Sequence, residues 1–116
     1  MKISLIICAY NEENYIQACL EHALKNSRGK FHEIIVVDNN STDRTKKIAE
    51  KIAGVKVVHK LEKGPNHARQ RGIKVATGDF VAFIDADTQM PEDWIDIAVN
   101  EFKKNPRLIS ISGPYI

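Results

Sequence analysis

Two carboxylates, Asp85 and Asp87, stand two positions apart directly after the apolar run at residues 80–84. Neighbouring carboxylates repel each other and are costly to remove from water. In an extended segment, residues two apart project to the same side, so both could face one edge while Ala86 points away. Oxygen ligands suit Mg²⁺ or Mn²⁺, and Mg²⁺ usually combines one or two carboxylates with substrate phosphates. The spacing predicts a cation site completed by a phosphate-bearing ligand; the alternative is a solvated strand end or a cap for a helix at Pro91.

The elements that must position this pair alternate along the chain. Five short runs rich in β-branched residues predict strands, and the four stretches between them show apolar residues at helical spacing. Asn11 can cap the first helix, Glu12 favours its N-terminus, and Ser41 with Asp43 suits the start of the second helix. This order predicts an α/β fold, a mainly parallel sheet with helices on both faces. The predicted strands are residues 3–8, 34–37, 55–58, 80–84 and 108–111, and the predicted helices cover 16–24, 48–52, 68–76 and 95–102.

Polar residues follow four of the predicted strands. Open parallel sheets bind ligands at the carboxyl ends of their strands, so these four clusters are expected to converge on one edge. Several of their side chains are carboxylates, which a divalent cation or hydrogen-bond donors would keep from repelling one another. The clusters are residues 9–13, 38–43, 59–64 and 85–88.

Composition limits the classes of protein to which the chain can belong. With 116 residues, 17 of them basic and 15 acidic, it has the size of one domain and a net charge of +2 without a basic block. Nothing in this pattern calls for nucleic acid. No run approaches the ~18 apolar residues of a membrane span, and no signal-peptide pattern follows Met1, so we expect a cytoplasmic protein. Cys8 and Cys19 lack the spacing of a metal site and are expected to be reduced thiols.

Three stretches carry a family resemblance: "SLIICAYNEENYIQACLEHAL", then "IIVVDNNSTDRT", then "GPNHARQRGIKVATGDFVAFIDADT". In this order they resemble the nucleotide-sugar-binding half of family-2 glycosyltransferases, which have the Rossmann-like GT-A fold. The chain departs from the family pattern at four positions. Cys8 stands in place of the usual Pro, Asn39 in place of a second Asp, and Gln70 in place of Asn. Asn40 stands in place of the usual Gly and tolerates the left-handed backbone conformation that Gly would supply, so the turn is expected to survive.

The resemblance implies roles for three acids. Asp85 would lie toward the ribose, and Asp87 would bind the metal that bridges the diphosphate of the donor. Asp38 would accept a hydrogen bond from the imide N–H of a uracil; the alternative for Asp38 is helix capping, for which Ser41 is better placed.

Four further residues are candidates for nucleotide contacts. Tyr10, beside Ala9, offers an aromatic face that could pack against a base, although ordinary burial against the second helix would explain it equally well. Lys63 and Arg69 are candidates for the diphosphate or the base edge, although a loop lysine is usually only solvated. The resemblance thus adds Ala9, Tyr10, Lys63 and Arg69 to the three acids.

The predicted function is therefore that of a donor-binding domain over residues 1–116. It would bind a nucleoside-diphosphate sugar, preferably a UDP-sugar, with Mn²⁺ or Mg²⁺, for inverting transfer to the hydroxyl of an acceptor that the sequence does not reveal. No catalytic base can be named, and we expect the chain to stop before the acceptor-binding half. The alternatives are a nucleotide-binding module without turnover, or a haloacid-dehalogenase-type phosphotransferase, whose Asp-x-Asp follows the first strand and continues with Thr or Val where this chain has Gln89. The glycine motifs of dinucleotide-binding and P-loop enzymes are absent from the sequence.

Overall fold

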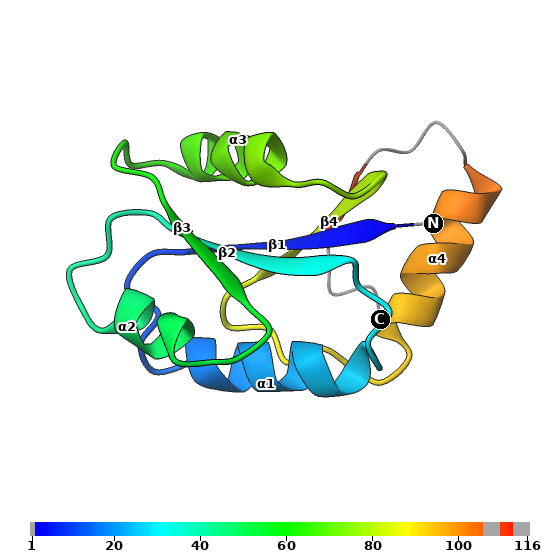
Figure 1. Cartoon of the computed structure of the whole chain (residues 1–116), viewed down its shortest axis with the longest axis horizontal. Coiled ribbons are helices and arrows are strands. Elements are labelled where there is room, and N and C mark those ends of the chain that lie inside the picture. The colour runs from blue at the N-terminus through cyan, green and yellow to red at the C-terminus, as the bar shows by residue number, and fades with distance from the viewer. Residues whose placement is uncertain (1, 106–109, 113–116) are drawn as a thin grey trace.

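Strands and helices alternate throughout the computed structural model, which describes residues 2–105 and 110–112 (Figure 1). The predicted order of elements is confirmed. Of the predicted fifth strand, residues 108 and 109 lie outside the described residues. The elements are β1 (Ile3–Ala9), α1 (Ile16–Asn26), β2 (Glu33–Asp38), α2 (Thr45–Glu50), β3 (Lys56–His59), α3 (Pro65–Val75), β4 (Phe80–Asp85), α4 (Trp94–Lys104) and β5 (Ser110–Ser112).

The strands form one parallel sheet in the order β3-β2-β1-β4-β5. The chain therefore runs outward from β1 through β2 to β3, and then crosses back past β1 to β4 on its other side. Ala9 pairs with Asp38 on β2, and Cys8 pairs with Asp85 on β4, so the carboxyl ends of these three strands lie level. The connections that leave β1 and β4 diverge at this point, which is where open α/β sheets bind ligands.

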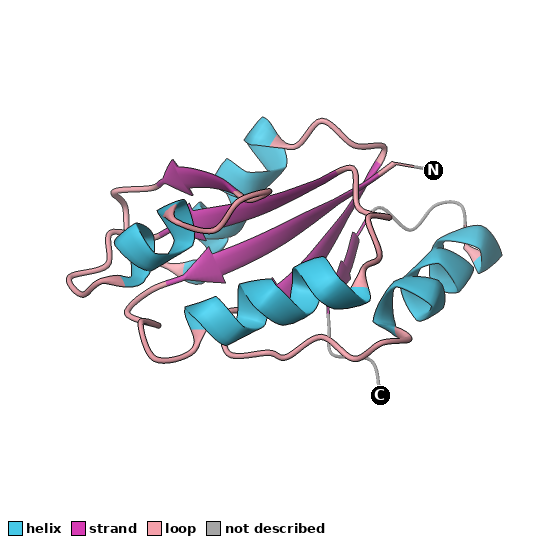
Figure 2. Cartoon of the chain, turned by 60° about the horizontal axis from the view of Figure 1, so that its bottom comes forward, coloured by secondary structure: helices cyan, strands magenta, loops and turns pink. Residues whose placement is uncertain are grey.

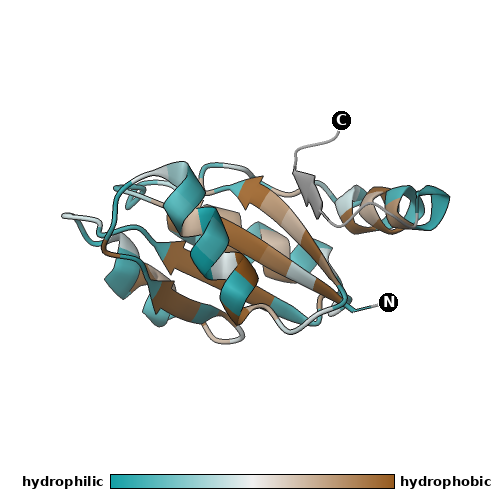
Figure 3. Cartoon of the chain, turned by 90° about the horizontal axis from the view of Figure 1, so that it is seen from above, coloured by the Kyte–Doolittle hydropathy of each residue, from teal (hydrophilic) through white to brown (hydrophobic). Residues whose placement is uncertain are grey.

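The sheet is covered by helices on both faces, as predicted. Helix α3 lies on one face, and α1 and α2 lie on the other (Figures 1 and 2). Successive residues of β1 belong to opposite layers: Leu5 and Ile7 pack with residues of α1 and α4, whereas Ile6 packs with Ala68 of α3. Strands buried on both faces must be apolar at nearly every position, which explains the continuous hydrophobic runs (Figure 3). Among residues 2–105, no helix is long and apolar enough to cross a membrane.

Helix α3 approaches the sheet closely at Gly72. A Cβ atom at this position would stand 2.5 Å from Cγ2 of Ile6 and 3.3 Å from Cγ2 of Val37. Both neighbours are β-branched and tightly packed, so they could not move aside without strain. Gly72 therefore sets the distance between α3 and β1, and with it the position of the N-terminal end of α3 above the carboxyl ends of the strands.

The connection after β1 differs from the prediction. Helix α1 begins at Ile16, so Asn11 does not cap it and Glu12 does not lie in its first turn. Asn11 instead adopts a left-handed conformation (φ +52°), and its Oδ1 accepts a hydrogen bond from the Thr42 backbone N–H at 2.8 Å. Glu12 accepts through its backbone oxygen from the N–H groups of Tyr15 and Ile16. The loop is thus pinned to the β2–α2 connection, which leaves the Glu12 side chain free for another role.

A hydrogen-bond cluster closes the opposite, amino-terminal edge of the sheet, and it makes stability depend on pH. Glu33 accepts hydrogen bonds from Ser4 Oγ and from the Thr77 backbone N–H, both at 2.6 Å. Partial burial acts to raise the pKa of Glu33, but the hydrogen bonds from Ser4 and Thr77 outweigh it and lower that pKa. A lowered pKa in the folded state means that the stabilisation is complete above the unfolded-state pKa and is lost as the pH falls through the folded-state value.

We therefore expect Glu33→Gln to lower the free energy of unfolding at pH 7, because the charge of the hydrogen-bonded carboxylate is lost. The loss should be only about 1 kcal/mol, since Glu33 is partly exposed and its interactions are screened by solvent. The difference from wild type should shrink as the pH falls below the unfolded-state pKa of a glutamate, about 4.3, toward the lowered folded-state pKa of Glu33. Urea denaturation of both proteins at pH 7 and pH 3.5 measures this difference. A gap that is equally large at both pH values would contradict the role of the carboxylate charge.

Candidate functional site

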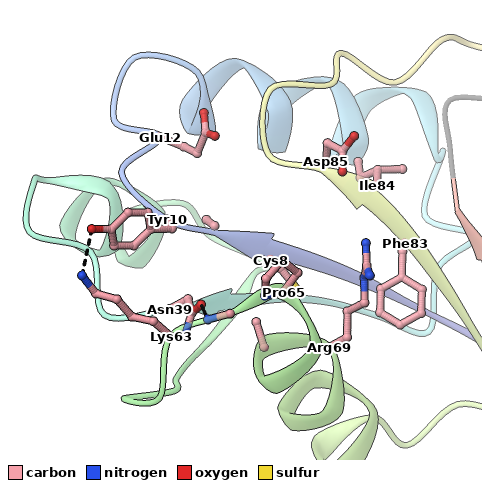
Figure 4. Close-up of a pocket in the computed structure, with 13 residues that line it drawn as sticks. Cys8, Tyr10, Glu12, Asn39, Lys63, Pro65, Arg69, Phe83, Ile84 and Asp85 are labelled. Carbon is pink, nitrogen blue, oxygen red and sulfur yellow. Dashed lines mark hydrogen bonds between the residues drawn. The ribbon is translucent and has the colours of Figure 1, made fainter.

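A cleft of about 470 Å³ opens at the carboxyl edge of the sheet, between β1, β4 and the N-terminal end of α3 (Figure 4). It lies at the end of the sheet, on the face that α3 covers. Cys8 of β1, Asn39 after β2, and Phe83 and Asp85 of β4 all point to this face. The lining residues are Cys8, Ala9, Tyr10, Glu12, Asn39, Lys63, Gly64, Pro65, Ala68, Arg69, Phe83, Ile84 and Asp85.

Positive charge gathers on the side of the cleft formed by α3. Lys63 precedes the helix, and Arg69 extends from its second turn alongside Phe83 toward β4 (Figure 4). Gly64 and Pro65 also line the cleft, so the N-terminus of an 11-residue helix faces it with the positive end of its dipole. This side of the cleft is therefore suited to an anion.

Negative charge gathers on the opposite side, formed by β1 and β4. Glu12 and Asp85 line the cleft there (Figure 4). Partial burial, followed by the negative charges of Asp87, Asp43 and Asp85, raises the pKa of Glu12. The carboxylates of Asp87, Asp43 and Asp85 therefore all act on Glu12. Such a concentration of acids is expected to attract a cation.

The two acids that open the β4–α4 connection are arranged differently from the predicted extended segment. Strand β4 ends at Asp85, and a turn follows in which the Thr88 N–H donates to the Asp85 backbone oxygen at 3.0 Å. Asp85 and Asp87 are nevertheless both exposed, while Ala86 between them is 4% exposed, so the expected alternation holds. Asp85 points into the cleft, and Asp87 lies outside its lining. The charge of Asp87 acts mainly on Glu12 and Cys19.

The acidic side fits a divalent cation only if a ligand completes the coordination. Within residues 2–105 and 110–112, no three acidic, histidine or cysteine side chains converge closely enough to hold an ion. Mg²⁺ and related ions are commonly held by one or two carboxylates together with phosphate oxygens. Asp85, which lines the cleft, and Asp87, which is exposed two residues further on, offer oxygen donors that suit a site of this kind.

Tyr10 and Lys63 meet at one end of the cleft. The Lys63 Nζ donates a hydrogen bond to the Tyr10 hydroxyl at 3.0 Å and lies 4.8 Å from the centroid of its ring (Figure 4). Tyr10 is 41% exposed and lines the cleft, so it is not buried, as the alternative to base packing requires. An aromatic face and a cation are thus available together at the same end of the site.

Asp38 does not line the cleft. It is 1% exposed, its Oδ2 accepts from the Ser41 N–H at 3.3 Å, and the same oxygen lies 3.5 Å from Nδ1 of His59. Its Oδ1 is buried without a hydrogen-bond partner among the described residues. Asn39, the next residue, lines the cleft instead, because it follows Val37 on the α3 face of the sheet.

Cys8, which stands where the resemblance calls for Pro, places a neutral group between opposite charges. Burial raises its pKa to about 11; Arg69 lowers that pKa and Asp85 raises it, so a cation and an anion both act on the thiol. A thiol with this pKa stays protonated near neutral pH. Cys8 itself therefore carries no charge that would repel an anion.

Five of the seven predicted site residues meet in the cleft: Ala9, Tyr10, Lys63, Arg69 and Asp85. Asp38 and Asp87 lie outside its lining. The prediction missed three residues of the lining. Glu12 was expected only at a helix start, Asn39 only as a replacement for an Asp, and no role was predicted for Gly64. All three fall within the polar clusters that follow the strands, so their position in the sequence was the signal that could have identified them.

Comparison with known proteins identifies relatives of this chain. Residues 4–116 match the sequence profile described as Glycosyl transferase family 2. The chain is 37% identical over 120 residues to the dolichol-phosphate mannosyltransferase of Pyrococcus furiosus, covering 100% of this chain and 34% of that protein.

Two solved structures are similar to the fold. One is S. aureus TarS 1-349 in complex with UDP-GlcNAc, with a TM-score of 0.78 and 33% identity over 91% of this chain and 32% of that one. The other is glucosyl-3-phosphoglycerate synthase from Mycobacterium tuberculosis in complex with Mn²⁺, UDP and glucosyl-3-phosphoglycerate, with a TM-score of 0.77 and 28% identity over 87% of this chain and 39% of that one. The chain thus spans about a third of the length of these relatives.

Proposed function

This chain belongs to glycosyl transferase family 2, and from that membership we propose that its cleft binds the nucleoside diphosphate of a sugar donor. The donor is a UDP-sugar, and the reaction that it serves is inverting transfer of the sugar to an acceptor hydroxyl. Residues 1–116 act as the donor-binding domain. The bound UDP-GlcNAc of TarS and the bound UDP and Mn²⁺ of glucosyl-3-phosphoglycerate synthase support this choice of ligand.

The division of charge across the cleft is the observation that carries the proposal. A nucleoside diphosphate is an anion that is usually bound together with a divalent cation. Lys63, Arg69 and the N-terminus of α3 supply the positive side that suits the phosphates. Asp85 and Asp87 supply the carboxylate side, where Asp87 would hold Mn²⁺ or Mg²⁺ and Asp85 would lie toward the ribose. Such an ion, when bound, stabilises the negative charge that develops on a diphosphate leaving group.

The nucleoside is placed at the end of the cleft that holds Tyr10. The exposed ring of Tyr10 offers a packing surface for the base, and Ala9 beside it leaves room for the base to approach. Base recognition by Asp38 stays a prediction. Its Oδ1, which has no hydrogen-bond partner among the described residues, is an acceptor that could take the imide N–H of uracil, but Asp38 does not line the cleft, whereas its neighbour Asn39 does.

Calorimetric titration of the chain with UDP and GDP, each with and without Mn²⁺, tests the proposal. We expect UDP to bind in the presence of Mn²⁺ and to lose at least about tenfold in affinity without it, because the acidic side would then face the diphosphate uncompensated. UDP should bind more tightly than GDP. UDP binding that is equally tight without Mn²⁺ would contradict the assignment of Asp87 to the cation, and absence of UDP binding under both conditions would contradict the proposed function.

A further inference from the structure

Asn39 is a buried amide that joins the end of β2 to the loop of residues 60–64, which we call the 60–64 loop. Only 6% of Asn39 is exposed. Its Nδ2 donates to the backbone oxygens of Lys60 at 3.0 Å and Glu62 at 2.7 Å, and its Oδ1 accepts from the Gly64 N–H at 3.0 Å. The Asn39 backbone N–H donates to the Ala9 oxygen of β1 at 2.8 Å. One residue therefore connects the central strands to three points of the loop.

The 60–64 loop has little apolar contact to hold it in place. Leu61 is 69% exposed, and Glu62 and Lys63 are also exposed. The ion pairs of Glu62 with Lys60 and His67 stay within the loop and the start of α3, so they do not attach it to the sheet. Loops with few buried contacts open at low cost. The side chain of Asn39 is thus the main attachment of the Glu62 and Gly64 backbone to the sheet.

Position 39 requires an amide side chain. Two of the three partners are carbonyl oxygens, which need N–H donors, while the third is an N–H, which needs an acceptor. An asparagine supplies all three, whereas a carboxylate at the same position could only accept. It would face the oxygens of Lys60 and Glu62 with like partial charge. Asn at position 39, where the family resemblance calls for a second Asp, is therefore matched to the loop that it holds.

The loop in turn places the cationic side of the cleft. Gly64 has φ +133°, a conformation that L side chains rarely adopt, and it leads directly into Pro65 at the start of α3. Lys63 precedes this bend, and its Nζ reaches the Tyr10 hydroxyl at 3.0 Å. A shift of the loop would move Lys63 away from the cleft. We propose that Asn39 is a positioning residue for nucleotide binding, which acts through Lys63 by fixing the 60–64 loop; this inference rests on the proposed function.

The substitution Asn39→Asp, made in the full chain, tests the inference, because it preserves the shape of the side chain and replaces the N–H donors by a charged oxygen. We expect the affinity for UDP with Mn²⁺ to fall about tenfold, the effect of losing one charge-assisted contact. In the Lys63→Ala background, the same substitution should change the affinity less than about twofold, since the contact through which it acts is already absent. Asn100→Asp, on an exposed position of α4, is the control for the added charge and should bind UDP as the wild type does.

The double-mutant comparison separates positioning from simple repulsion. A new carboxylate that only repelled the diphosphate would weaken UDP binding equally with and without Lys63, and that result would overturn the inference. Unchanged UDP affinity in Asn39→Asp would also overturn it.

Limited trypsin digestion gives a measurement that does not depend on the ligand. Trypsin cleaves after Lys60 and Lys63, and a released loop should be cut several-fold faster in Asn39→Asp than in the wild type. Equal cleavage rates would contradict the anchoring of the loop. If the wild-type chain binds no UDP, the proposed function fails and Asn39 has no nucleotide to position, while the digestion still decides whether Asn39 holds the loop.

Discussion

Asp87→Asn is expected to lower the affinity of the chain for UDP in the presence of Mn²⁺ by about tenfold or more. The substitution keeps the size of the side chain but removes the charge of a group that we assign to the cation. Asp87 is exposed, so its loss should leave stability nearly unchanged. The affinity for UDP measured without Mn²⁺ should stay the same or rise slightly, because one repulsive carboxylate is gone. Titration calorimetry in both conditions measures these affinities.

The matched control for Asp87 is Glu92→Gln. Glu92 is an exposed acid in the same β4–α4 connection, and it does not line the cleft. Its substitution removes an equal charge from nearly the same segment, so it should leave the Mn²⁺-dependent affinity unchanged. Equal losses in the two variants would indicate a general field effect, and no loss in Asp87→Asn would refute its assignment to the cation.

Arg69→Ala is expected to weaken UDP binding about 10- to 100-fold. A guanidinium that contacts a phosphate makes charge-assisted hydrogen bonds, and each is worth about 1.5–3 kcal/mol. Arg69 is exposed on α3 and extends into the cleft beside Phe83, so its truncation removes positive charge without opening the core (Figure 4). The loss should be larger for UDP than for uridine, which carries no phosphate. Competition of both ligands against a fluorescent UDP analogue measures this difference.

Arg71→Ala is the control for Arg69, because it removes the same side chain from the same helix. Residues that are two positions apart on a helix cannot share a face, and Arg71 does not line the cleft. Its substitution should leave UDP affinity within about twofold of wild type. If both arginine variants lost affinity equally, the effect would come from net charge, and the assignment of Arg69 to the phosphates would be wrong.

The positions of the strands and helices could be predicted from the sequence because they depend on local periodicity. The run at residues 80–84 is apolar at every position, since β4 is buried by side chains on both faces, and the observed strand extends it by one residue to Asp85. The first residues of the helices were harder to predict. Asn11 has the chemistry of a cap, but its Oδ1 binds Thr42 in the neighbouring connection, a partner 31 residues away. Local preference was overridden there by a contact that exists only after the strands pair.

By itself, the sequence determined that four polar clusters follow the strands of a parallel sheet, and that positive and negative groups would therefore meet at one edge. Only the tertiary structure decided which side chains enter the cleft. Adjacent strand residues point to opposite faces, so the choice between Asp38 and Asn39 depends on which face α3 covers, and that is set by how the chain crosses the sheet. Asn39 and Asp85 share the α3 face, Asp38 lies on the other, and Asp87, in the turn after Asp85, lies outside the cleft lining.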